Sequence, residues 1–214
     1  MTARILLFAF LSLAFAAQTF TGVALAHPHV WVTMKSELVY AADGTVTGVR
    51  HNWTFDDMFS TFATQGLESK EKGKFTREEL SDLAKVNIDS LKEFNYFTIA
   101  TADGIKTALN PPAPDYWLDY NDEALTLHFT LPLKAPAKAR ELKVEVYDPT
   151  FFISFELAKE TPVRLVNAPA QCKLAIQPPR KLSFWEEKKL AEESADSPDN
   201  WGAAFANKIL VTCL

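Results

Sequence analysis

The sequence predicts a sheet-rich α+β domain whose antiparallel sheets form a β-sandwich-like core, with an inserted helical segment and a disulfide-tied C-terminal region. Three observations predict this fold class. Short runs of β-branched and aromatic residues are separated by turn residues, two Ala-Asp-Gly turns are flanked by such runs, and the chain has one pair of cysteines. The net charge of −5, spread among both signs, gives no reason to expect nucleic acid as a partner.

The first 26 residues have the organisation of a secretory signal peptide. Arg4 precedes the apolar run 5–11, and Ala24-Leu25-Ala26 matches the small-residue cleavage pattern. Polar residues interrupt the apolar character from Gln18 onward, short of the roughly 20 apolar residues that a membrane-spanning helix needs. We therefore expect cleavage of residues 1–26, a periplasmic location, and a single mature domain over residues 27–214.

The first mature strands are predicted to form a hairpin of residues 29–40 and 45–55 around the turn Ala42-Asp43-Gly44. A turn centred near residues 42 and 43 places His29 opposite Asp56. A slip of one residue in this pairing would change whether Asp56 or the adjacent Asp57 faces inward. His51 lies within an apolar alternation on the second strand, which is typical of a buried, hydrogen-bonded histidine but also leaves it as a metal-ligand candidate.

Helices and further strands are expected after this hairpin. Asp56 begins a short helix as its N-cap residue, and Thr76 with Glu79 forms a capping box for a longer helix that runs to about Asn95. Aromatic residues in the strands are expected to fill the core. The expected strands are 96–100, 105–109, 116–120, 124–131, 142–147 paired with 151–157, 163–166, 173–176 and 209–211; short helical stretches are expected from Ser183 and over 201–206.

Cys172 and Cys213 are the only cysteines of the chain. In an oxidising compartment two thiols most simply form one disulfide. In the chain-entropy description, closing a loop of about 40 residues stabilises the fold by roughly 4 kcal/mol. A thiolate metal site is the alternative, but no histidine lies near either cysteine in the sequence, so we expect the structural disulfide.

The candidate metal site lies at the start of the mature chain. After cleavage, His27 carries a free α-amine and can chelate a divalent metal through this amine and its ring Nδ1, with His29 supplying a second imidazole. Asp56 or Asp148 supplies an oxygen. This mixed nitrogen and oxygen set suits zinc most, with nickel or copper as alternatives. N-capping and metal ligation by Asp56 are compatible, because a carboxylate has two oxygens.

Four stretches of the chain resemble the motifs of a bacterial family of periplasmic proteins of unknown function. The family is catalogued as the periplasmic component of an uncharacterised ABC-type transport system. The resemblance implies a periplasmic partner of a nickel/cobalt-type membrane permease, with a link to zinc acquisition, but it transfers no ligand set. The stretches are HPHVW at 27–31, WTFDDMFS at 53–60, FNYFT at 94–98 and VYDPTFF at 146–152.

The expected function is therefore binding and delivery of a metal to a membrane permease, without catalysis and without a small organic substrate. Two alternatives stay open. The first is a structural or assembly subunit of a membrane transport complex that binds no metal. The second is a copper enzyme with an N-terminal histidine brace, which needs a second histidine from a remote strand. His51 and His128 are the candidates for that role, although His128 is expected on the polar face of its strand.

Overall fold

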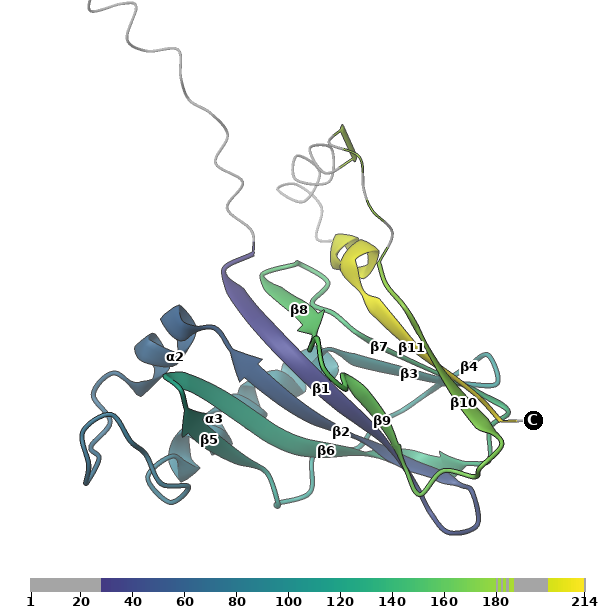
Figure 1. Ribbon diagram of the computed structural model, residues 1–214, viewed down its shortest axis with the longest axis horizontal. Helices are drawn as coiled ribbons and strands as arrows, with labels where there is room; N and C mark the ends of the chain where they lie inside the picture. Colours follow the sequence, from purple (N-terminus) through teal and green to yellow (C-terminus); the bar gives the residue numbers. More distant parts are fainter. Residues whose placement is uncertain (1–27, 180, 182, 184, 187–199, 214) are drawn as a thin grey trace, which may run out of the picture.

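A computed structural model describes residues 28–179, 181, 183, 185–186 and 200–213 (Figure 1). The helical elements in this part of the chain are α2 (Asp57–Thr64), α3 (Ser81–Leu91), and the 3-10 segments η1 (Lys92–Phe97) and η2 (Trp201–Phe205). The strands are β1 (Val30–Tyr40), β2 (Val46–Phe55), β3 (Thr98–Ala102), β4 (Ile105–Thr107), β5 (Trp117–Asn121), β6 (Ala124–Ala137), β7 (Glu141–Val146), β8 (Ile153–Leu157), β9 (Val163–Val166), β10 (Cys172–Gln177) and β11 (Asn207–Cys213).

The strands form two sheets, as the sequence predicted. The first sheet has the order β5-β6-β2-β1-β8, with β9 also paired to β1, and the second has the order β10-β11-β7-β3-β4. The prediction of antiparallel sheets is wrong for two pairs, because β8 and β9 both run parallel to β1. The predicted pairing of 142–147 with 151–157 is also wrong. After β7 the chain crosses from the second sheet to the first, where β8 pairs with β1, and both edges of β7 are occupied by β11 and β3.

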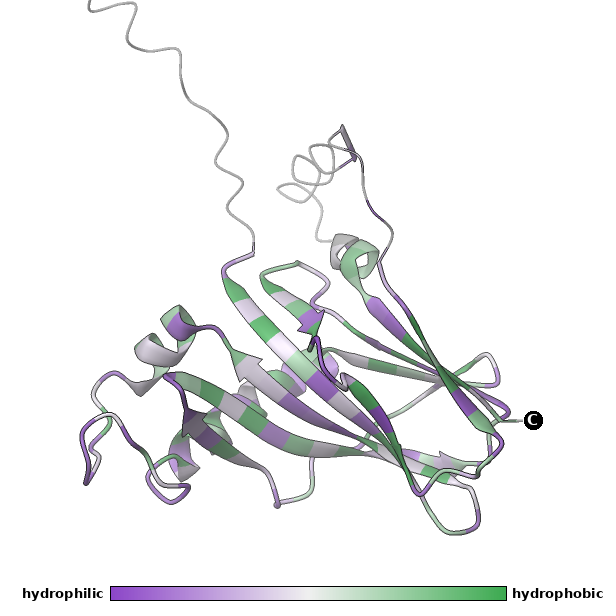
Figure 2. Cartoon of the chain, viewed as in Figure 1, coloured by the Kyte–Doolittle hydropathy of each residue, from purple (hydrophilic) through white to green (hydrophobic). Residues whose placement is uncertain are grey.

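One hydrophobic core joins the two sheets. Hydrophobic and hydrophilic residues alternate along the central strands (Figure 2), which gives each strand one buried face. Met34, Trp53 and Phe129 of the first sheet belong to the same buried cluster as Val144 and Ile209 of the second. The sheets therefore stabilise each other by burying their inner faces together, in a two-layered arrangement.

The β1–β2 hairpin is confirmed, but its register differs from the prediction by two residues. Val32 pairs with Phe55, and the backbone of Asp56 is hydrogen-bonded to that of Trp31, so Trp31 and not His29 lies opposite Asp56. The shift arises because the turn is longer than expected and β2 contains an irregularity at Thr47. A shift of two keeps every side chain on its predicted face.

The helical segment begins as predicted and ends differently. Thr76 and Glu79 make the reciprocal hydrogen bonds of a capping box, with Glu79 Oε2 accepting from the Thr76 amide at 2.8 Å and Thr76 Oγ1 from the Glu79 amide at 3.2 Å. The α-helical part, α3, ends at Leu91, and the helical segment continues as the 3-10 segment η1. At Asn95 the backbone turns into the left-handed region. Phe94, which lies between the end of α3 and this turn, is 53% exposed.

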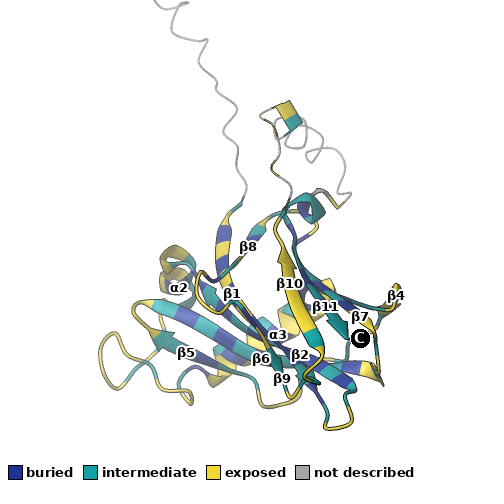
Figure 3. Ribbon diagram, turned by 45° about the vertical axis from the view of Figure 1, so that its right-hand side comes forward, coloured by how far each residue is buried: buried dark blue, intermediate teal, exposed yellow. Residues whose placement is uncertain are grey.

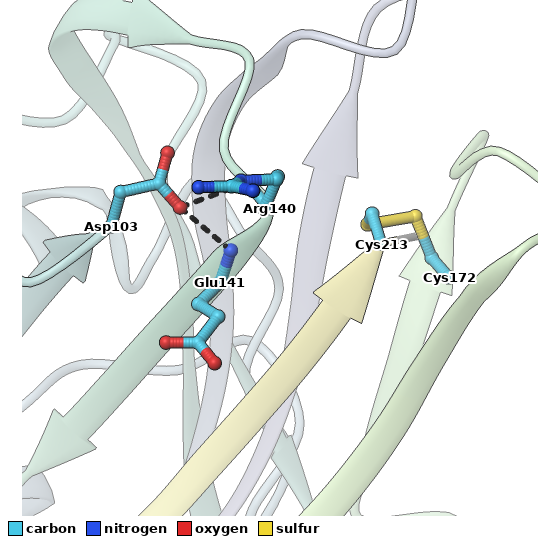
Figure 4. The surroundings of a disulfide bond; sticks show 5 residues. All are labelled: Asp103, Arg140, Glu141, Cys172 and Cys213. Atoms are coloured by element: carbon cyan, nitrogen blue, oxygen red, sulfur yellow. Dashed lines mark hydrogen bonds between the residues drawn. A yellow bond between two sulfur atoms is a disulfide. The ribbon is translucent and has the colours of Figure 1, made fainter.

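The C-terminal region is joined by the predicted disulfide between Cys172 and Cys213 (Figure 4). These residues are directly paired in the β10–β11 ladder. Close by, Asp103 Oδ1 accepts hydrogen bonds from the amides of Arg140 and Glu141, both at 2.9 Å. The disulfide secures β10, an edge strand that is largely exposed (Figure 3).

Some predicted elements lie partly or wholly outside the described residues. The predicted signal peptide lies there entirely. Ser183 and Glu186 make the capping hydrogen bonds expected at the start of a helix, but residues 187–199 are not described. Within the described part of the chain, no helix is both long and apolar enough to cross a membrane.

Replacing both cysteines, in the double variant Cys172→Ala/Cys213→Ala, is expected to lower the free energy of unfolding by about 2–5 kcal/mol, because the unfolded chain loses the constraint of a loop with a sequence separation of 41 residues. Urea denaturation followed by circular dichroism measures this change. Wild-type protein treated with a reductant should lose a similar amount. Equal stability of the oxidised, reduced and substituted proteins would contradict a stabilising role.

Candidate functional site

Three of the predicted ligands lie on chain segments that border the beginning of β1. His29 directly precedes the strand, its amide donates to the carbonyl of Phe152 at 2.9 Å, and its ring lies 4.8 Å from the Phe152 ring. Asp56 reaches this end of β1 from β2, and Asp148 reaches it from the loop before β8. The pairing of β1 with β2 on one edge and with β8 on the other places these three segments at the same end of the first sheet.

Asp56 is an N-cap residue, as predicted, and it also clamps β1. Its Oδ1 accepts from the Phe59 amide of α2 at 2.8 Å, while its Oδ2 accepts from the Trp31 amide at 2.8 Å. One carboxylate thus holds the start of α2 against the start of β1. Since an ionised carboxylate has about four lone-pair positions, each oxygen keeps one for a further partner.

Asp148 is 4% exposed and organises its own loop. Its Oδ1 accepts from the amide and the hydroxyl of Thr150, and its Oδ2 accepts from the Ile153 amide at 3.0 Å. Gly202 of η2 packs against this loop so closely that a Cβ there would lie 1.8 Å from the Asp148 carbonyl oxygen. With three hydrogen bonds already accepted, Asp148 is a poorer metal ligand than Asp56.

His51 is not part of this group. It is completely buried, and its Nδ1 lies 2.9 Å from Ser36 Oγ and its Nε2 3.3 Å from Thr98 Oγ1. Its ring packs against both Trp53 and Phe129. Burial lowers the pKa of His51 to about 3, so the ring is neutral at physiological pH. Both nitrogens lie next to hydroxyl groups from different strands, which fits the buried, hydrogen-bonded histidine of the sequence analysis and gives no support to His51 as a metal ligand.

His128 lies on the polar face of β6, as predicted, within a network that holds the edge strand β5. Its Nδ1 is 2.9 Å from Asn52 Oδ1, and its Nε2 is 3.0 Å from Asp119 Oδ2 without the alignment of a hydrogen bond. Trp117 stacks on the ring at 4.6 Å, and Arg77 covers the other side of Trp117. Burial lowers the pKa of His128, an effect that Asp119 opposes and Arg77 reinforces.

His128 lies far from the start of β1 along the first sheet. His128 pairs with Asn52, which pairs with Lys35, six residues beyond His29. Six residues of a β-strand span about 20 Å. Neither histidine that the sequence offered as the second ligand of a copper brace therefore lies beside His29.

A complete metal site needs a ligand beyond these side chains. Among the described residues, no group of three or more histidine, cysteine or acidic side chains is arranged to hold a metal ion. His27, the predicted N-terminal ligand, lies outside the described residues. The described part of the candidate site thus consists of His29 and the two aspartates.

An apolar cavity of about 680 Å³ adjoins this end of β1. Its lining comes from β1, β2, α2, α3, η1 and the segment that leads into β8. All four stretches that carry the family resemblance contribute to it. Representative lining residues are Val30, Trp53, Phe97 and Phe152.

A left-handed turn shapes one wall of the cavity. Asn95, Tyr96 and Phe97 have φ values of 50°, 54° and 48°, a conformation that costs roughly 1–3 kcal/mol for each non-glycine residue. The Phe97 carbonyl accepts from the Tyr147 amide at 3.0 Å, which holds the turn in place. The turn buries Tyr96 and Phe97 to 5% exposure while Phe94 stays outside.

The profile of a family described as "Protein of unknown function (DUF1007)" matches residues 12–213. The chain belongs to the DUF1007 family. It is also 32% identical, over 115 residues, to an "Uncharacterized 15.5 kDa protein" of Spirochaeta aurantia, in a match that covers 53% of this chain and 81% of the relative. Neither description names an activity, so any functional conclusion for this DUF1007 protein rests on its site.

Sequence reasoning missed the cavity of this DUF1007 protein. Its aromatic residues were expected to fill the core, and this holds for Trp53, Phe55 and Phe155. Phe62 and Phe152, by contrast, are 75% and 47% exposed. The available signal was the Phe-rich character of the motif stretches, but only the fold shows that they meet around one space.

The buried His51 predicts a measurable pH dependence of stability. The unfolded chain binds a proton at this residue below a pKa of about 6.5, whereas the folded protein does so only below about 3. The contribution of His51 to the free energy of unfolding is therefore fully present above the pKa of the unfolded chain. It is lost as the pH falls between the two pKa values, with a slope of at most about 1.4 kcal/mol per pH unit. In His51→Gln, urea denaturation between these pH values should show a shallower loss; curves parallel to those of the wild type would contradict the assignment.

Proposed function

We propose that the protein is a periplasmic accessory protein of a zinc or nickel/cobalt transport system. It leaves the cytoplasm with a signal peptide that is cleaved after residue 26, and the mature domain, residues 27–214, binds a divalent metal and delivers it to a membrane permease. This proposal is supported by the position of three chain segments: those that carry His29, Asp56 and Asp148 are each hydrogen-bonded beside the start of β1 or β8, at the end of the first sheet where the proposed mature chain begins.

The chemistry of this group favours a mixed nitrogen and oxygen site. His29 is exposed, and Asp56 keeps a lone-pair position on each oxygen, so these two are the preferred ligands among the described residues. His27 adds its ring and its α-amine, which completes a set suited to zinc or nickel. Pro28 has no amide hydrogen, so the chain cannot form the usual square-planar copper site that needs a deprotonated amide at this position.

Acid should weaken this site. The α-amine has a reference pKa near 8 and imidazole one near 6.5, and both groups bind metal only in their deprotonated forms. Metal affinity is therefore expected to fall as the pH is lowered through this range. Release at low pH is a consequence of the ligand types and requires no conformational change.

The position of the α-amine provides the main test. Calorimetric titration with zinc and with nickel compares the processed protein, which begins at His27, with the same protein carrying one additional N-terminal glycine. The extended form should bind each metal with an affinity lower by a factor of about ten or more, because its amine is displaced from the chelate. Equal binding by both forms would move the site elsewhere, and absence of binding by the processed form would refute direct metal binding.

A second test separates capping from ligation at Asp56. Asparagine is as good an N-cap as aspartate, but its NH2 group cannot accept the hydrogen bond that the Trp31 amide donates to Oδ2. Asp56→Asn should therefore lower the free energy of unfolding by about 1–3 kcal/mol and also weaken zinc binding, because the charge of the ligand is lost. Asp57→Asn, one residue further, removes the same charge from an exposed residue outside the proposed ligand set. If both variants bind zinc equally well, Asp56 has a structural role only.

The assembly-subunit alternative has one observation in its favour. Large apolar side chains are exposed around the cavity, among them Phe62 and Phe94, and such clusters mark interaction sites. A protein that associates with the permease but binds neither zinc nor nickel would fit this second function. The copper-enzyme alternative has no comparable support, because His51 and His128 are both engaged away from His29.

A further inference from the structure

The cavity beside β1 has the properties of a ligand site. We propose that it binds the hydrocarbon chain of an uncharged lipid, a function separate from metal binding. Its volume of about 680 Å³ falls within the roughly 300–1,000 Å³ of pockets that hold small organic molecules. An apolar cavity of about 150 Å³ is enough to hold benzene, so this one has space for a much longer molecule.

The floor of the cavity is buried and rigid. Val32 and Trp53 are each 1% exposed and Phe155 is 5% exposed, and all three belong to the shared core of the two sheets. Trp53 packs edge-on against Phe129 and lies 4.7 Å from the Phe155 ring. Because the sheet holds these side chains, the space is part of the folded structure and does not have to open for a ligand.

Three polar side chains of the lining already form hydrogen bonds within the protein. Asn87 donates to the Leu83 carbonyl and Ser90 to the Val86 carbonyl, each at 2.8 Å within α3. The carboxylate of Asp148 accepts three hydrogen bonds from its own loop. The lining therefore offers a ligand mainly carbon surface, which selects hydrocarbon.

Charge selects against a fatty-acid anion. The residues that line the cavity include no lysine or arginine, and their one ionisable side chain is the acidic Asp148. A carboxylate ligand would find no cation there and would meet a like charge. An ester or an alcohol carries no charge and has no such penalty.

The mouth of the cavity is lined by exposed apolar side chains from separate elements. Phe62 of α2, Val86 of α3, Phe94 of η1 and Phe152 before β8 are 75%, 61%, 53% and 47% exposed. A chain that enters between them would cover surface that is otherwise in contact with water. The strained turn at residues 95–97 lies directly behind Phe94, and such strain clusters at ligand sites.

The test uses the mature protein in the presence of EDTA, so that its outcome does not depend on the metal proposal. N-phenyl-1-naphthylamine, an uncharged fluorescent probe, is titrated into the protein and then displaced by methyl palmitate or by palmitate. We expect one saturable site, displacement by the ester, and displacement by the anion at about tenfold higher concentration or more. Absence of saturable probe binding would refute the cavity as a ligand site, and equal competition by the anion would refute the selection for uncharged lipids.

Two variants and one control locate the binding. Ala63→Trp fills the cavity from α2, and Val86→Trp obstructs its mouth from an exposed position on α3 that tolerates substitution. Each should weaken probe binding by about tenfold. Ile105→Trp, on β4 and 74% exposed, makes a comparable change outside the cavity lining and should leave binding unaltered. Binding that is unchanged in Val86→Trp and Ala63→Trp would overturn the assignment.

A last comparison identifies the source of the chain. Vesicles of phosphatidylcholine are added to the probe-loaded protein and separated by sedimentation. Probe release by vesicles assigns the site to the acyl chain of a membrane phospholipid, whereas release by methyl palmitate alone assigns it to a free neutral lipid. Release by an apolar helical peptide, with no effect of either lipid, would overturn the proposal in favour of protein docking.

Discussion

The structure depends on β1 being hydrogen-bonded along both edges. β2 pairs with it over nearly its whole length on one side, and β8 and then β9 pair with it in parallel on the other. A strand held on both sides cannot shift its register without breaking two ladders. The first described residues of the chain are therefore fixed at one end of the first sheet, together with Asp56 from β2 and the Asp148 loop before β8 (Figure 1).

The alternation of side chains along β1 lets this one strand end support two different sites. The side chains of Val30 and Val32 line the apolar cavity, whereas the intervening Trp31 is 44% exposed on the other face. His29 lies at the boundary, against Phe152, which is itself part of the cavity mouth. The proposed metal site and the proposed lipid site are thus neighbours, although their chemistry is unrelated.

The aspartates and histidines illustrate how far sequence reasoning reaches at this site. The hairpin rule brought Asp56 beside the start of β1, and the N-cap preference assigned its second contact, because both are local effects of sequence. The role of His51 was not local. Ser36 and Thr98, which occupy its two nitrogens, come from the neighbouring strand and from the other sheet, and the parallel entry of β8, which places Asp148 here, follows from a crossover that no short pattern encodes.

The sequence by itself determined the sheet-rich class, the positions of most strands, the capping box, the disulfide and the family motifs, because periodicity, turn residues and a single cysteine pair act over short distances or leave one choice. Only the tertiary structure decided which strands are neighbours, where the 3-10 segment after α3 gives way to the left-handed turn at Asn95, and that Trp53, Phe97 and Phe152 surround one cavity. The physical reason is that burial is a collective property. A strand pattern states that a face will be covered, and the packing of the remaining chain decides what covers it and where a space is left.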